Sequence, residues 1–99
     1  MTEPTSDIQV RDNPAEQRYE VSVDGHVAGI SEYELEDGVI TFVHTEVSEA
    51  VEGRGIGSRL AAGALDDVRR RGLRVVDECP FISAYIRRHP AYADLLERG

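Results

Sequence analysis

The sequence predicts an α/β domain with a mixed, mainly antiparallel sheet and a β-α-β unit at its core. Segments rich in β-branched residues fill the first half of the chain. A helical period of apolar side chains then begins near Ile56, and a short apolar segment with a second helical pattern follows it. The 99 residues leave room for one domain. We expect that domain to span residues 7–99, after a flexible tail at residues 1–6.

The first half of the chain alternates strand patterns with turn signals. Alternating apolar residues and β-branched residues predict strands at 7–11, 18–23, 26–35 and 39–47. Asp24-Gly25 is a strong two-residue hairpin signal, and Asp37-Gly38 marks another turn. The first strands are therefore expected to pair in antiparallel order.

The second half changes from a strand period to a helical one. Ile56, Leu60, Ala64 and Val68 recur every four residues, and Gly72 predicts the end of this helix. Residues 73–76 predict a strand, and a second helix is expected to open at Pro80 and run through residue 88, before a last turn at 91–96. A crossover of this kind joins parallel strands, so strands 39–47 and 73–76 should be neighbours.

Composition excludes several classes of function. The formal net charge of −8 argues against nucleic-acid binding and is compatible with a cationic substrate. No apolar run is long enough to span a membrane, and the polar start lacks a signal-peptide pattern, so we expect a cytoplasmic protein. A single cysteine, Cys79, excludes an internal disulfide framework. The histidines and Cys79 have no metal-ligand spacing, so no metal is expected.

A glycine-rich turn, Glu-Gly-Arg-Gly-Ile-Gly at residues 52–57, lies between the longest strand and the first helix. Glycines there let backbone N–H groups approach a ligand, and the helix dipole favours an anion such as a phosphate. The chain has no lysine for a P-loop, and Ser58 stands where a dinucleotide fingerprint needs its third glycine. The alternative is a glycine-rich loop before an ordinary helix.

Three separated blocks carry a family resemblance. They are His-Thr-Glu-Val at 44–47, the glycine turn, and Cys-Pro at 79–80 with Tyr-Ile-Arg-Arg-His-Pro-Ala-Tyr at 85–92. In this order they resemble the small single-domain branch of the GCN5-related N-acetyltransferase superfamily, over roughly residues 8–96. The resemblance implies the minimal fold of that superfamily, acetyl-CoA as co-substrate, and an amine acceptor that is either a small molecule or a protein.

The resemblance also implies where coenzyme A binds. The family's loop reads Gln/Arg-x-x-Gly-x-Gly/Ala, and Glu52 stands at the Gln/Arg position, where a carboxylate would repel phosphate. A backbone N–H near Val47 is the implied donor to the oxyanion. The expected cofactor-binding residues are Val47, Glu52, Gly53, Arg54, Gly55, Ile56, Gly57, Ser58, Arg87 and Arg88. The three arginines are included because their charge suits phosphates, and the alternative for each is a solvated surface charge.

Strand alternation predicts that Ile40, Phe42, His44 and Glu46 share one face. That face would end in two titratable groups beside the glycine turn, so His44 or Glu46 is a candidate general base for deprotonating the amine. The alternatives are a hydrogen-bonded core histidine and a solvated strand end.

Cys79 and Tyr85 are the other catalytic candidates. Cys79 is expected to share a pocket with His44, either as a nucleophile that carries the acetyl group or as a group that only shapes the pocket. Tyr85 matches the tyrosine that protonates the leaving thiolate in larger relatives, and its alternative is a core aromatic. Direct acetyl transfer is the favoured mechanism. The competing functions are a non-catalytic coenzyme A sensor or adaptor, and a structural domain without a ligand.

Overall fold

The computed structural model describes residues 7–51 and 53–97. The predicted tail at 1–6 and the predicted site residue Glu52 lie outside the described residues. The order of elements is β1 (Ile8–Asn13), β2 (Arg18–Val23), β3 (His26–Glu36), β4 (Val39–Val47), α1 (Ile56–Arg70), β5 (Arg74–Asp77) and α2 (Pro80–Arg88), with short 3-10 turns at Pro14–Glu16, Glu49–Val51 and Pro90–Leu95. The predicted α/β class is confirmed.

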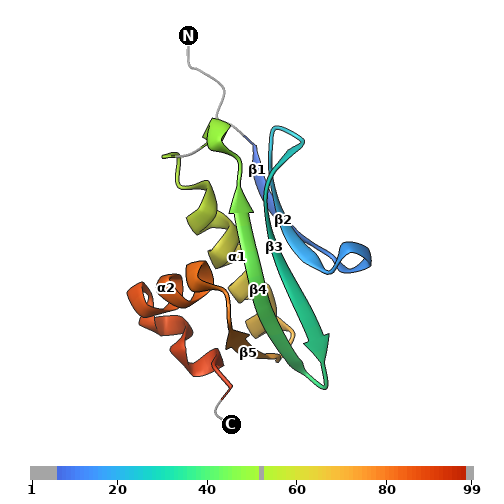
Figure 1. The fold of residues 1–99 in the computed structure, drawn as a ribbon, viewed down its shortest axis with the longest axis vertical. Helices are drawn as coiled ribbons and strands as arrows, with labels where there is room; N and C mark the ends of the chain where they lie inside the picture. Colours follow the sequence, from blue (N-terminus) through green and yellow to red (C-terminus); the bar gives the residue numbers. More distant parts are fainter. Residues whose placement is uncertain (1–6, 52, 98–99) are drawn as a thin grey trace.

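The five strands form one sheet in the order β1-β2-β3-β4-β5. Neighbours are antiparallel except β4 and β5, which are parallel and are joined through α1, as predicted. The two helices lie against the same face of the sheet and touch each other (Figure 1). The buried core lies between this face and the helices, and the opposite face is left open within the part of the chain that the structure describes.

A β-bulge at Val43 changes which side chains of β4 face the helices. Glu32 of β3 pairs with His44, and the next residue of β3 pairs with Phe42, so Val43 is an extra residue in β4. A bulge interrupts the alternation of side chains along a strand. Phe42 and Thr45 therefore lie on the helix side, and His44 lies on the open face together with Glu46.

The predicted common face for Ile40, Phe42, His44 and Glu46 is therefore wrong. Ile40 and Phe42 are fully buried, whereas His44 and Glu46 are exposed on the other side of the sheet. Regular alternation, on which the prediction rested, fails at the inserted residue.

Strands β4 and β5 diverge beyond Phe42. They pair only from Val39 to Phe42, and the N–H of Cys79 then donates to the Phe42 carbonyl at 2.8 Å. At the far end of β4, the Ser48 N–H donates to Ala28 of β3 at 2.7 Å. Because backbone groups alternate along a strand, the N–H of Val47 points away from β3, toward the edge that β5 has left.

A polar cluster fastens the C-terminal end of α1 to the sheet. The Tyr19 hydroxyl donates to Asp67 at 2.6 Å, and the Tyr33 hydroxyl donates to Asp12 at 2.6 Å. Arg71 bonds to Asp12 at 3.1 Å and to the Tyr19 hydroxyl at 3.3 Å. Burial first, and the nearby carboxylate of Asp12, raise the pKa of both tyrosines to about 12. This cluster holds the fold at the end opposite the glycine turn.

Candidate functional site

The glycine turn adopts the backbone conformation that its composition predicts. Gly53 and Gly55 have φ angles of +81° and +73°, a region that side chains other than glycine rarely adopt. Gly55 is the N-cap of α1 and makes no side-chain cap. The N–H groups of Ile56, Gly57 and Ser58 belong to the first turn, where no intrahelical acceptor exists. The loop therefore presents backbone donors at the positive end of a 15-residue helix.

A cavity of about 270 Å³ lies at this turn. Its walls come from the loop, the end of β4 and the first turn of α2, and the lining residues are Val47, Val51, Gly53, Gly55, Ile56, Gly57, Ser58 and Phe81. The structure thus brings together most of the predicted cofactor residues around one hollow.

Phe81 is a wall of this cavity that the sequence analysis missed. A Cβ atom placed on Gly57 would lie 2.8 Å from the Phe81 ring, so the helix and the ring are in direct contact only because residue 57 is glycine. The only feature of the sequence that could have indicated Phe81 is its position directly after the Cys79-Pro80 block.

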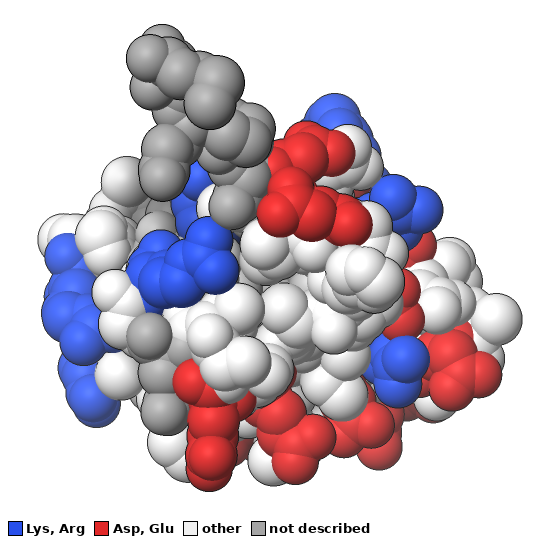
Figure 2. All heavy atoms as spheres, turned by 90° about the horizontal axis from the view of Figure 1, so that it is seen from above, with Lys and Arg blue, Asp and Glu red and all other residues white. Residues whose placement is uncertain are grey.

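The predicted arginines occupy different places. Arg54 is exposed in the loop. Arg87 and Arg88 are exposed in the last turn of α2, at the opposite end of that helix from Phe81. Arg59, which was not predicted, is exposed in the first turn of α1. Figure 2 shows basic side chains at the left of the view and others at the right among acidic side chains, while several acidic side chains follow the lower edge.

Cys79 lies on the helix side of the sheet and is 2% exposed. Its Sγ is 3.3 Å from the Thr45 hydroxyl, which is 2.9 Å from the hydroxyl of the fully buried Ser31. This row of hydroxyls crosses β3 and β4 where β4 begins to separate from β5. Sequence reasoning missed it because strand pairing brings together residues that are 14 and 34 positions apart.

His44 and Cys79 do not share a pocket, contrary to the prediction. Thr45 contacts Cys79, and its neighbour His44 points to the other face of the sheet. There the His44 Nε2 atom is 3.2 Å from a carboxylate oxygen of Glu46, and the two side chains are 52% and 69% exposed. His44 and Glu46 therefore form a solvated pair on the open face, and the thiol is buried beneath the sheet.

Tyr85 belongs to a cluster that holds the C-terminal segment. Its ring stacks on His89, with centroids 4.2 Å apart, and lies 6.0 Å from the ring of Tyr92. Tyr92 in turn donates to Asp66 of α1 at 2.7 Å. Burial, followed by the nearby Asp66 carboxylate, raises the pKa of Tyr85. These contacts give the Tyr-x-x-x-His-Pro-x-Tyr block a packing role.

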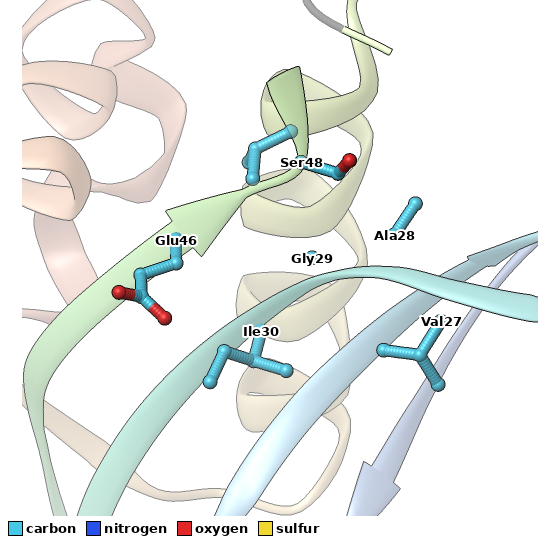
Figure 3. Close-up of a pocket in the computed structure, with 7 residues that line it drawn as sticks. Val27, Ala28, Gly29, Ile30, Glu46 and Ser48 are labelled. Carbon is cyan, nitrogen blue, oxygen red and sulfur yellow. The ribbon is translucent and has the colours of Figure 1, made fainter. Parts of the chain in front are cut away.

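A second hollow of about 450 Å³ lies on the open face, at the same end of β4 (Figure 3). Val27 and Ile30 of β3 form apolar walls, and Glu46 of β4 borders them. Val47 lines both this hollow and the cavity at the glycine turn. The two hollows thus share one lining residue at the end of β4. The sequence analysis did not predict the second one.

Comparison with known proteins shows the family and the fold of the chain. A sequence profile of the GCN5-related N-acetyl-transferase family matches residues 18–95. Protein NATD1 of Xenopus tropicalis is 31% identical over 90 residues, which are 89% of this chain and 83% of that protein. Protein NATD1 of Homo sapiens is 32% identical over 85 residues, covering 84% of this chain and 75% of that protein. The solution structure of a GCN5-like protein from Staphylococcus aureus has the same fold, with a TM-score of 0.68 at 20% identity over 90% of this chain and 87% of that one.

The chain belongs to the GCN5-related N-acetyltransferase family. No group of three or more potential metal ligands occurs among the described residues. No helix within 7–51 and 53–97 is long and apolar enough to cross a membrane.

Proposed function

We propose that the protein is an acetyl-CoA-dependent N-acetyltransferase that moves the acetyl group directly from the thioester to an amine. The observation that carries this proposal is the place of Val47. It lines the cavity at the glycine turn, and it lies in the part of β4 that no longer pairs with β5. One end of this cavity offers the N–H groups of the glycine turn, which suit a phosphate. The other end offers the N–H of Val47 beside the gap between β4 and β5, which suits an oxyanion.

The described residues fit the chemistry of coenzyme A. Backbone N–H groups of Ile56, Gly57 and Ser58 would hold the pyrophosphate, with Arg54 and Arg59 adding positive charge nearby. Val47 and Phe81 give the cavity an apolar wall suited to the uncharged arm of the molecule. Arg87 and Arg88 remain proposed phosphate partners, although their end of α2 is remote from the loop. Glu52 has no described position.

The chemical step needs a base, an oxyanion donor and a proton for the thiolate. The amine nitrogen bonds to the acetyl carbon, the carbon–sulfur bond breaks, and the amine loses one proton. The N–H of Val47 is the proposed oxyanion donor, and His44 is the proposed base, with Glu46 holding the imidazole. Tyr85 remains the proposed acid for the thiolate, and Cys79 is proposed to shape the gap rather than to carry the acetyl group.

Calorimetric titration with coenzyme A and acetyl-CoA tests binding, and release of free thiol with a panel of amines tests transfer. We expect micromolar binding, and amine-dependent thiol release that falls at least about tenfold in His44→Gln without loss of coenzyme A affinity. Absence of binding would overturn the proposal. Tight binding with neither transfer nor thioester hydrolysis would favour the coenzyme A sensor.

A further inference from the structure

One edge of the sheet is covered by the chain itself, and the other edge is free. Beside β5, the C-terminal segment covers the edge, because Leu96 forms a bridge to Val75 and the Glu97 N–H donates to the Val75 carbonyl at 2.7 Å. At the opposite edge, β1 pairs with β2, and no other segment within residues 7–51 and 53–97 pairs with it. An uncovered edge strand is a template for pairing with another chain.

The backbone of β1 offers a regular row of hydrogen-bonding groups at this edge. The Asp24 N–H donates to the Asp7 carbonyl at 2.8 Å, and the register of β1 with β2 has no shift along the whole strand. Because backbone groups alternate in an antiparallel pair, those of every second residue after Asp7 face β2, and those of Ile8, Val10 and Asp12 point outward. β1 contains neither a proline nor a bulge against β2, which are two of the features that protect edge strands.

The exposed side chains along this edge form a row with opposite charges at its two ends. The Gln9 amide donates to Asp7 at 3.0 Å, and Arg11 donates to Gln9 at 3.3 Å, so the three exposed side chains lie in line. Neither Asp7 nor Arg11 makes an ion pair within the part of the chain that the structure describes. Glu20, which faces Arg11 from β2, is bonded to Arg18 at 2.9 Å instead. The row is therefore complementary to a copy of itself that runs in the opposite direction.

We infer that β1 pairs with β1 of a second copy of this chain, in an antiparallel register centred on Gln9, and joins the two sheets into one. In this register Asp7 of each copy lies opposite Arg11 of the other, and opposite charges in facing positions stabilise a strand pair. Ile8 lies opposite Val10 of the second copy on the helix side, which adds an apolar contact. Each of these facing pairs exchanges both of its backbone hydrogen bonds across the edge. The inference concerns assembly and goes beyond the proposed function.

The neighbouring symmetric registers lack this complementarity. A pair centred on Val10 would set Asp12 opposite Ile8 on the helix side, where Asp12 already bonds to Arg71 at 3.1 Å. A pair centred on Arg11 would set the two Arg11 guanidinium groups against each other, and like charges in facing positions destabilise a strand pair. The presence of both charges in one short row favours a second copy over a uniformly acidic or basic segment of another protein.

The pairing leaves the candidate functional site accessible. A twofold axis between antiparallel strands is perpendicular to the sheet, so the helices of both copies lie on the same face of the joined sheet. Val10 packs against Gly63 of α1, which holds β1 on the helix layer of its own copy. No residue of β1 lines the cavity at the glycine turn or the hollow on the open face. Binding of coenzyme A should therefore be independent of this assembly.

Sedimentation velocity of the full chain, at concentrations between about 2 and 500 μM, tests the inference. Asp7→Arg sets like charges opposite each other in the proposed pair, and so does Arg11→Asp. An equimolar mixture of these two variants restores opposite charges at both positions. Ile8→Pro removes an N–H that points away from β2, and proline is tolerated at the first residue of a strand. The matched control is Glu34→Arg, which makes the same change of charge as Asp7→Arg at an exposed residue of β3.

We expect the wild type to dimerise with a dissociation constant on the order of tens of micromolar, because a pair of short strands buries less area than a standard interface. Asp7→Arg, Arg11→Asp and Ile8→Pro should each weaken dimerisation at least about tenfold, whereas Glu34→Arg should change it less than about twofold. The equimolar mixture should recover the wild-type affinity to within about threefold, which also shows that both charge variants are folded.

A wild type that stays monomeric up to about 500 μM would overturn the inference. Dimers that persist in both charge variants, a mixture that remains monomeric, or an equal loss in Glu34→Arg would overturn it as well. Calorimetric titration with coenzyme A separates this result from the proposed function. Failure of the wild type to bind coenzyme A would count against the proposed function, and sedimentation would still decide whether the chain dimerises through β1.

Discussion

Replacing Gly57 with alanine should separate coenzyme A binding from folding. The added Cβ atom would lie 2.8 Å from the tip of the Phe81 ring and 3.5 Å from a methyl group of Val47. The second distance is an ordinary contact, so the strain falls on the ring. The ring must move by about 0.6 Å to reach ordinary contact distance, and it is a wall of the cavity at the glycine turn.

Gly57→Ala should lower coenzyme A affinity more than it lowers the free energy of unfolding. Alanine in a helix is more stable than glycine by up to about 1 kcal/mol, and shifting a partly exposed ring costs about 0.5–1.5 kcal/mol. The free energy of unfolding should therefore change by less than about 1 kcal/mol. A methyl group and a displaced ring in a cavity of about 270 Å³ should lower coenzyme A affinity at least about tenfold.

Calorimetric titration with coenzyme A and urea denaturation measure the two effects separately. Ser58→Ala is the matched control, because Ser58 is the next residue of the same turn and its side chain is exposed. The shorter side chain in Gly57→Ala/Phe81→Leu should restore most of the affinity. Wild-type affinity in Gly57→Ala, or an equal loss in Ser58→Ala, would refute the assignment of this cavity.

Three further predictions concern the packing, pH dependence and chemistry of the molecule. A Cβ atom on Gly63 of α1 would lie 2.7 Å from the Cβ atom of Val10 in β1, so Gly63→Ala should lower stability in urea by about 1–2 kcal/mol despite its helix propensity. Val10→Gly removes that atom, so the loss in Gly63→Ala/Val10→Gly should be smaller than the sum of the two single losses; a Gly63→Ala variant more stable than the wild type would show that β1 is free to move. Tyr19 and Tyr33 bind protons more tightly in the folded state, because their pKa values are about 12 against an ordinary 10.0. The free energy of unfolding should therefore be at its full value below pH 10 and should fall between pH 10 and 12. Denaturation curves should show a shallower fall for Tyr19→Phe, and an unchanged fall would argue against this cause. Cys79→Ala should keep most of its acetyl-transfer turnover, and an acetyl group found on Cys79 by mass spectrometry and passed on at the steady-state rate would contradict direct transfer.

The fold could be predicted from the sequence because its local signals agree with one another. The predicted strands at 18–23 and 39–47 have the observed bounds, and the turn that separates β2 from β3 contains Asp24 and Gly25, both with positive φ. The helix predicted from Ile56 ends at Arg70, two residues before Gly72, which has a φ of +71°. Periodicity and turn chemistry are properties of neighbouring residues, so no long-range information was needed.

The candidate site was predictable only in part, because much of it depends on contacts between distant residues. The glycine turn could be predicted because its residue types alone indicate its backbone conformation. The bulge at Val43 does not, since valine is an ordinary strand residue, and its extra position appears only in the pairing of β3 with β4. Phe81 reaches Gly57 through the packing of α2 on α1, and Ser31 reaches Thr45 through strand pairing. None of these contacts has a local pattern.

The bulge also bears on the route of transfer. On the helix side, Cys79 is buried against Thr45, next to the gap that leads to the glycine turn. On the open side, His44 and Glu46 are solvated beside the second hollow. A route through an acetylated Cys79 would require the amine to reach a thiol that is 2% exposed, without the base on its own face. Direct transfer requires only that amine and thioester meet at the end of β4, which both hollows reach through Val47. The arrangement of the two faces therefore favours direct transfer with His44 as the base.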